Sequence, residues 1–317
     1  MAIPVSETYQ HFAFMMGIIS QNENVQANLY NSYINVYLRE NDWGETTLEF
    51  SNATCEDYRL QGIGEMDLYY VKNIEKSNCI GFFKERIDQD NYLLLFRVDE
   101  YEISYSKYYH KTHFFHDTYV FGYDEDCFDV MAYKDGHLSM MKVPQREIVD
   151  GIYTCLEFED DIHFCSFRVF HKARIEINTD EILRQVDKYL TEEENENGNP
   201  SGITTYRVLQ DALAEFYRDD NNCYDLDVKL FRMLWEHKKM IVLRNQKLGG
   251  MIRRLQECDE LAHRLEQMSS TMMLMVIKYN VSHDLAIVKR IINQLNHIKN
   301  EEVEYWNKFR EIVKDGI

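Results

Sequence analysis

The side chains best suited to acid–base chemistry lie in one short segment, HFFHDTYVFGYD, which spans residues 113–124. Its aromatic and β-branched residues predict a buried strand that opens near His116, and Gly122-Tyr123-Asp124 predicts a tight turn into a second strand over 127–133. An imidazole titrates near neutral pH and can act as a general base or acid. His116 is therefore the candidate base. A histidine that starts a strand also often serves packing alone.

A metal site is the alternative for the same segment, because His110, His113 and His116 are spaced three residues apart. On an extended strand, residues three apart point to opposite faces and do not converge on one ion. Zinc also needs tetrahedral imidazole or thiolate ligands, and no matching second pair is present. We expect no metal here.

The elements that must position this segment differ between the two halves of the chain. Strand-like segments occupy 67–71, 91–98, 115–123, 128–132, 138–143 and 162–177, and helices are expected over 6–19, 25–38 and 145–152. An acidic, apolar-free stretch follows at 191–202. Amphipathic helices are then expected over 204–217, 228–248, 251–279 and 283–317.

Bulk composition limits the classes of function. The 317 residues suffice for two domains, and 45% apolar residues exclude a disordered chain. A net charge of −19 argues against nucleic-acid partners and against anionic membranes. Seven scattered cysteines without a Cys-x-x-Cys pair, and no visible signal peptide, indicate reduced thiols and a cytoplasmic location.

The chain resembles papain-like and C39-like cysteine peptidases, whose base histidine is followed by five residues and Gly-Tyr, as at His116. Within that fold it is similar to acyltransferases of bacterial natural-product clusters, related to the butirosin-pathway acyltransferase and the amide-forming enzyme of closthioamide assembly. Segments 6–14, 29–35, 98–103 with 113–124, and 230–239 carry the resemblance. It implies an α+β papain-like domain over 1–180, an acidic linker over 181–203 and a helical lid domain over 204–317.

The resemblance also implies where the nucleophile should lie. The family places a cysteine at the start of the first long helix, where free N–H groups stabilise an anion, about six residues before a Phe-Ala pair. Counting back from Phe12-Ala13 leads to Ser6, and no cysteine precedes Cys55. A serine here fits a natural nucleophile, an inactivated cysteine, a lineage without catalysis, or an ordinary helix N-cap.

Other site residues follow from the same resemblance. The family carries Asn or Asp about sixteen residues after the histidine, where this chain has Ala132, so Asp129 is the candidate third catalytic residue and Asp135 the alternative. A dyad without such a residue is the simpler arrangement. Gln10 is a stand-in for the glutamine that donates to the oxyanion.

Two further groups could bind substrate or partner. Tyr105 and Tyr109 precede the histidine segment and could line a pocket for an extended substrate. A basic stretch on a predicted helix could dock an acidic carrier protein or the phosphate of its phosphopantetheine; its residues are Lys238, Lys239, Arg244 and Lys247. A charge-balancing helix face is the alternative for these cations.

The leading hypothesis is an acyltransferase without a cofactor of its own. It would move an acyl group from an acyl or peptidyl carrier-protein thioester, through Ser6 with His116 as base, to a small-molecule amine. The alternatives are a papain-fold binding protein that has lost its nucleophile, and a cytoplasmic cysteine-type peptidase using Cys55 or Cys79.

Overall fold

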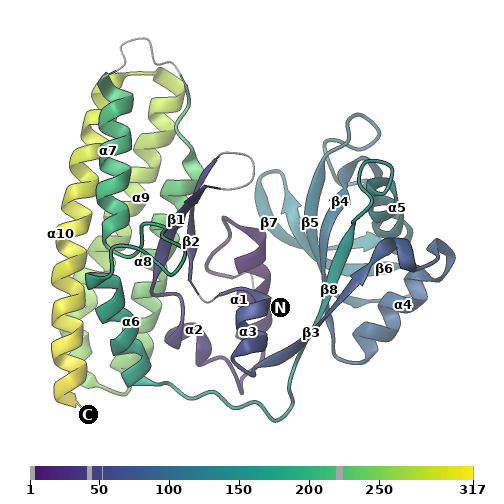
Figure 1. The fold of residues 1–317 in the computed structure, drawn as a ribbon, viewed down its shortest axis with the longest axis horizontal. Helices are drawn as coiled ribbons and strands as arrows, with labels where there is room; N and C mark the ends of the chain where they lie inside the picture. Colours follow the sequence, from purple (N-terminus) through teal and green to yellow (C-terminus); the bar gives the residue numbers. More distant parts are fainter. Residues whose placement is uncertain (1–3, 41–44, 52, 219–223, 317) are drawn as a thin grey trace. The chain divides into compact units, whose positions relative to one another are not determined.

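The computed structural model describes residues 4–40, 45–51, 53–218 and 224–316, which fold as two compact units. The sheet unit contains Met1–Gln26 and Ala53–Ile175, and the helical unit contains Ala27–Asn52 and Glu176–Ile317. Figure 1 shows the strands of the first and the long helices of the second. The predicted α+β composition with a helical C-terminal region is confirmed.

The sheet unit is built on one antiparallel sheet with the strand order β3-β8-β4-β5-β6-β7. Asp135 and Gly136 both have positive φ, so they form the two-residue turn that suits the twist of the β6–β7 hairpin. The strands are β3 Gly64–Tyr70, β4 Tyr92–Asp99, β5 Phe115–Tyr123, β6 Cys127–Lys134, β7 His137–Pro144 and β8 His163–Val169.

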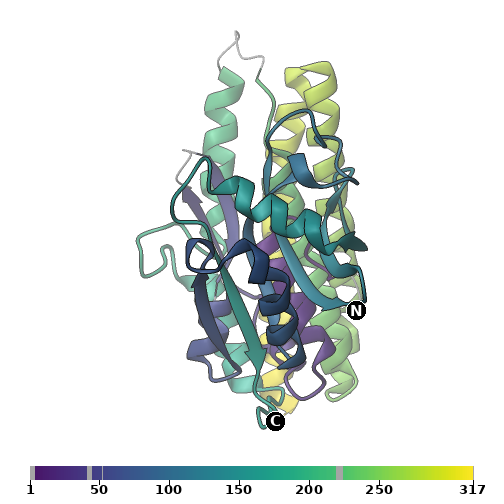
Figure 2. The ribbon, with the colours of Figure 1, turned by 90° about the vertical axis from the view of Figure 1, so that its right-hand side faces the viewer.

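Helices α4 (Lys76–Asp88) and α5 (Gln145–Cys155) cover one face of this sheet (Figure 2). Phe83 of α4 and Ile152 of α5 join the buried cluster that includes Val120 of β5. On the same strand Tyr119 points to the other face, where its ring lies 5.4 Å from Phe14 of α1 (Gln10–Gln21). Apolar residues on alternate positions of β5 therefore hold helices on both faces.

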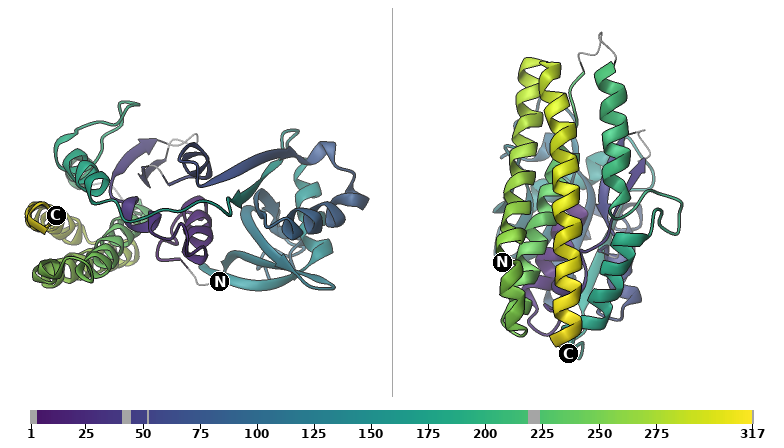
Figure 3. Two further views of the ribbon diagram at one scale, coloured as in Figure 1. Left: turned by 90° about the horizontal axis from the view of Figure 1, so that it is seen from below. Right: turned by 90° about the vertical axis from the view of Figure 1, so that its left-hand side faces the viewer.

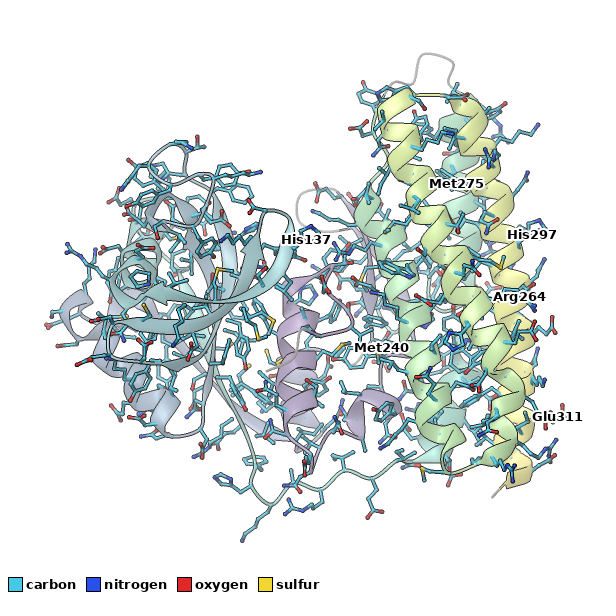
Figure 4. All side chains as sticks on the ribbon, turned by 180° about the vertical axis from the view of Figure 1, so that it is seen from behind. His137, Met240, Arg264, Met275, His297 and Glu311 are labelled. Carbon is cyan, nitrogen blue, oxygen red and sulfur yellow. The ribbon has the colours of Figure 1, made fainter. Side chains whose placement is uncertain are left out.

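The helical unit combines a two-stranded sheet, β1 (Val36–Glu40) with β2 (Thr46–Phe50), with long helices. Arg264 of α9, labelled in Figure 4, donates to Glu301 of the neighbouring α10 at 2.6 Å. Figure 3 shows α9 and α10 side by side. The helices are α2 Asn28–Asn31, α6 Thr179–Thr191, α7 Thr204–Arg218, α8 Val228–Gly249, α9 Asp259–Ser282 and α10 Leu285–Gly316.

The buried guanidinium of Arg244 holds the early segment of this unit to α8. Its Nε donates to the carbonyl of Tyr30 at 2.8 Å, and one Nη donates to Ser32 and Tyr33 at 2.5 and 3.2 Å. Because these carbonyls end α2 and lead toward β1, one side chain satisfies backbone groups that the short helix leaves open.

Several predicted elements differ from the structure. The first helix begins at Gln10, not at residue 6, and the helix predicted over 25–38 is wrong, since only Asn28–Asn31 is α-helical and β1 follows. The predicted linker over 181–203 contains most of α6, whose Ile182, Val186 and Tyr189 recur at helical spacing and are buried. Segment 27–52 also belongs with the C-terminal helices instead of with the sheet.

Short elements complete the description: α3 Cys55–Leu60 and the 3₁₀ turns Val71–Asn73, Glu100–Glu102 and Arg253–Cys258. Across the described ranges, no helix has both the length and the apolar run that a bilayer crossing needs.

Candidate functional site

The candidate base, His116, is held by a carboxylate that the sequence analysis did not identify. The register pairs Val98 of β4 with His116 of β5, so the residues just after β4 lie beside the start of β5. Oε1 of Glu100 lies 2.5 Å from Nδ1 of His116, and the hydroxyl of Ser106 donates to the other oxygen at 2.5 Å. A proton on Nδ1 bonded to Glu100 leaves Nε2 with its lone pair for chemistry.

A second histidine–carboxylate pair lies next to the first. Nδ1 of His113 is 2.6 Å from Oδ2 of the fully buried Asp99, whose other oxygen accepts the N–H groups of Tyr101 and Phe114. The ring of Tyr101 stacks on His113 at 4.6 Å. The consecutive acids Asp99 and Glu100 thus fix two imidazoles at the end of β4. Among the described residues, no group of three or more His, Cys, Asp or Glu side chains is placed to hold a metal ion.

The start of the chain reaches this region through Tyr133 of β6 and Gln10 of α1. The hydroxyl of Tyr133 donates to the backbone carbonyls of Glu7 and Thr8, and its ring lies 6.0 Å from the imidazole of His116. The amide of Gln10 donates to the carbonyl of Asp117 at 2.6 Å. Hydrogen bonds therefore hold segment 7–10 against β5, which carries His116, and β6, which carries Tyr133.

The carboxyl of Asp117, next to His116, is itself perturbed. Burial raises its pKa, and the backbone N–H of Arg97, which bonds Oδ1 at 3.3 Å, partly opposes that shift. Arg97 has a positive φ of 69° within the bulge where β4 slips against β5, and this bulge aims its N–H at Asp117.

Ser6, the candidate nucleophile, lies four positions before the first residue of α1, whose N-cap is Tyr9. It is fully buried, and its backbone N–H donates to the sulfur of Met16 at 3.5 Å. The N-cap interpretation of Ser6 is therefore wrong, because the N-terminus of α1 lies four positions after Ser6.

Asp129, the candidate third residue, lies elsewhere. Its carboxylate pairs with Lys142 of β7 at 3.0 Å, and its register partner on β5 is Gly122. Gly122 is six positions from His116, which is about 20 Å along an extended strand. Glu100 occupies the place beside Nδ1 that the sequence analysis expected Asp129 to take, because the strand register and not the downstream spacing brings the carboxylate to the histidine.

The two candidate substrate tyrosines lie in the loop between Glu100 and His113. Tyr105 is half-buried and packs against the core cluster of the sheet, and burial, with Glu100 and Glu147 nearby, raises its pKa. The backbone N–H of Tyr109 donates to Ser106, and its ring lies 3.9 Å from His110.

The predicted carrier-docking face is wrong for two of its four cations. Lys238 is fully buried, where its ammonium contacts both oxygens of Glu302 at 2.7 Å and donates to Nδ1 of His237 at 2.8 Å. Arg244 is buried against the carbonyls described above. Lys239 is half-buried over the ring of Trp235 at 3.7 Å, and Lys247 is exposed. Helix α8 packs on several sides, so it buries some of the cations that the sequence pattern predicted to lie together on one exposed face.

No protein-family model matches the chain, and no curated protein is similar to it.

Proposed function

We propose that the sheet unit is a papain-like acyl-transfer domain in which Ser6 takes the acyl group and His116, oriented by Glu100, moves the protons. One observation carries this proposal: Tyr133 contacts both segments. Its hydroxyl donates a hydrogen bond to the carbonyl of Glu7, the residue after Ser6, and its ring lies 6.0 Å from the imidazole of His116. The resemblance in the His116 and Ser6 segments supports the same assignment.

In the first step Nε2 of His116 takes the proton of the Ser6 hydroxyl while Oγ attacks the carbonyl carbon of a thioester. The C–S bond breaks, and the thiol leaves with the proton held by His116. An amine then attacks the acyl-serine ester, His116 receives the amine proton and returns it to Oγ, and an amide is released. The carboxylate of Glu100 stabilises the imidazolium that forms in both steps.

The acyl donor in this proposal is a thioester of an acyl or peptidyl carrier protein, and the acceptor is a small-molecule amine. The protein itself needs no cofactor, since the phosphopantetheine belongs to the carrier. Of the predicted docking cations, Lys239 and Lys247 are the two available for an acidic carrier.

A second candidate function is a binding protein that keeps the fold without the reaction. The observation that favours it is the complete burial of Ser6, four positions before the helix that would activate a nucleophile. A substrate reaches such a hydroxyl only if the residues that cover Ser6 move.

The deciding experiment is intact-mass analysis of Ser6→Cys after incubation with a panel of acyl thioesters. Acyl transfer predicts an added acyl mass on Ser6→Cys that is lost in Ser6→Cys/His116→Ala. Ser20→Cys is the matched control, since Ser20 lies on α1 and donates to Gly17. No adduct on Ser6→Cys, with thioester binding retained, establishes the second candidate. If the acyl group is released as a free carboxylic acid and not as an amide, the reaction is hydrolysis.

A further inference from the structure

A row of aromatic rings leads from His116 to a lysine in the loop that precedes it. The ring of Phe114 lies 4.5 Å from the imidazole of His116, and the ring of Tyr108 stacks on Phe114 at 4.4 Å. The ammonium of Lys107 lies 4.9 Å from the centre of the Tyr108 ring. Phe114 and Tyr108 are half-buried, so both are partly accessible. The row therefore joins the candidate base to an exposed cation.

The loop that carries this row is cationic, although the whole chain is acidic. From Ile103 to His116 the sequence has no Asp or Glu, whereas 54 of the 317 residues of the chain are acids. Lys107 and Lys111 are both exposed. Nζ of Lys111 donates to the carbonyl of Lys107 at 3.2 Å, which places its ammonium beside the Lys107 backbone. Among the described residues, Lys107 contacts a ring and Lys111 a carbonyl, and neither is paired with a carboxylate.

Two nearby acids hold this loop in position instead of pairing with its lysines. Glu100 accepts the hydroxyl of Ser106 at 2.5 Å, and Glu147 of α5 accepts the backbone N–H of Ser104 at 2.9 Å. Glu100 also bonds Nδ1 of His116. One carboxylate therefore links the position of the loop to the orientation of the candidate base.

We propose that Lys107 and Lys111 bind the phosphate of the phosphopantetheine arm that carries the acyl donor. This role rests on the proposed acyl transfer and defines the part of the donor that the loop recognises. Phosphate oxygens accept charge-assisted hydrogen bonds from ammonium groups, which lysine supplies as point charges. Both ammonium groups are exposed, whereas Lys238 and Arg244, which the sequence pattern indicated for this role, are buried.

The length of the arm fits this geometry. From phosphorus to the thioester sulfur the arm has about thirteen bonds, which extend to roughly 15 Å at the rise per bond of a peptide chain. The three steps along the row, 4.5, 4.4 and 4.9 Å, are together shorter than that. A phosphate held at Lys107 therefore lets the thioester reach His116. The methyl and methylene groups of the arm would lie against Phe114 and Tyr108, whose rings offer apolar surface.

The test compares phosphopantetheine with pantetheine, which lacks only the phosphate, in calorimetric titrations of the full chain. At low salt the phosphorylated compound should bind about tenfold more tightly, and high salt should reduce this preference. Lys107→Gln/Lys111→Gln should abolish the preference, whereas Lys107→Arg/Lys111→Arg should retain it. Lys84→Gln is the matched control, because Lys84 lies over the ring of Tyr123 at 5.0 Å, at the other end of β5.

Equal binding of the two compounds by the unsubstituted protein overturns this assignment, as does a preference that survives Lys107→Gln/Lys111→Gln, or no measurable binding of either compound. Intact mass of Ser6→Cys with acyl-phosphopantetheine and acyl-pantetheine tests the reaction separately. No adduct with either thioester, while the phosphate preference persists, contradicts acyl transfer and supports the phosphate site. Adducts that form equally fast with both thioesters contradict the phosphate site and support acyl transfer.

Discussion

At the scale of single residues, the candidate site pairs His116, which the sequence pattern indicated, with Glu100, which it did not. The strand pattern and the Gly-Tyr turn marked His116. Its partner Glu100 lies sixteen positions upstream, and the two meet only because Val98 pairs with His116 across β4 and β5. The spacing downstream of the histidine indicated Asp129 instead, but the carboxylate of Asp129 pairs with Lys142.

Glu100→Gln tests this pairing. Loss of the carboxylate removes the charge that fixes the Nδ1–H tautomer, so we expect the proposed acyl transfer to fall by about 10–100-fold. Nitrogen-15 NMR of the imidazole should show less of the Nδ1–H tautomer of His116, a change that does not depend on any assay of activity.

Asp129→Asn is the opposing variant and should leave the tautomer of His116 unchanged. If Asp129→Asn shifts the tautomer and Glu100→Gln does not, Asp129 is the orienting residue after all. Glu102→Gln controls for removing a neighbouring acid, since Glu102 accepts from Thr154 instead of from a histidine.

At the scale of elements, strands were easier to predict than helices. The predicted strands at 91–98 and 115–123 agree with β4 and β5, and the helix predicted at 145–152 agrees with α5. Helix α4 was missed, since only Cys79 and Phe83 are buried on it and its apolar pattern is weak. Segment 25–38 was misread because its buried apolar residues lie in a short helix, a loop and a strand with no common period.

The close packing of α5 on β4 gives a prediction with a matched control. A Cβ at Gly151 would lie 2.8 Å from Val98 and 3.1 Å from the Asp99 carbonyl, whereas one at Gly81 in α4 would meet nothing within 4 Å. Gly151→Ala should lower the free energy of unfolding by about 1–3 kcal/mol, because it pushes α5 from β4. Gly81→Ala should raise it by about 0.5–1 kcal/mol through helix propensity.

Urea unfolding followed by circular dichroism measures both changes. Equal effects from the two substitutions would mean that helix propensity alone governs Gly151. Because Asp99 lies at this contact, the His113 resonance should also move in Gly151→Ala and stay unchanged in Gly81→Ala.

At the scale of the whole molecule, the strand and helix patterns predicted the mixed architecture but not how the chain divides. Contiguous boundaries at 180 and 203 were expected, whereas the helical unit takes residues 27–52 from the first sixth of the sequence. The cause lies in buried polar contacts: His237 donates from Nε2 to the carbonyl of Ile34, and Arg244 bonds three further carbonyls nearby. Such long-range pairs leave no local pattern in a sequence.

These contacts predict how stability depends on pH. Nδ1 of His237 accepts a hydrogen bond from the Lys238 ammonium, so the imidazole is neutral in the folded state. Oε1 of Glu302 lies 3.6 Å from the same nitrogen. Burial, with the charges of Lys238 and Arg244, sets the pKa of His237 well below 6.5. The unfolded chain binds a proton below about pH 6.5 and the folded chain does not, so stability is fully present above that pH and falls on acidification.

The expected slope from this residue is about 1.4 kcal/mol per pH unit below pH 6.5. Urea unfolding at pH 7.5, 6.5 and 5.5 measures it, and His237→Gln should flatten the curve. His297→Gln, at an exposed position of α10 labelled in Figure 4, should keep the parent slope. An unchanged slope in His237→Gln would assign the acid sensitivity to other groups.

The Arg244 contacts also bear on how the protein is made. Tyr33 and Arg244 are 211 positions apart, so at about 5–20 residues per second a ribosome needs roughly 10–40 s to reach the arginine after the tyrosine. All of Ala53–Ile175 is translated in that interval. The nascent chain therefore carries Tyr30, Ser32 and Tyr33 before their Arg244 contacts can form, while the sheet is being completed. This early segment is where we expect a ribosome-associated chaperone to bind.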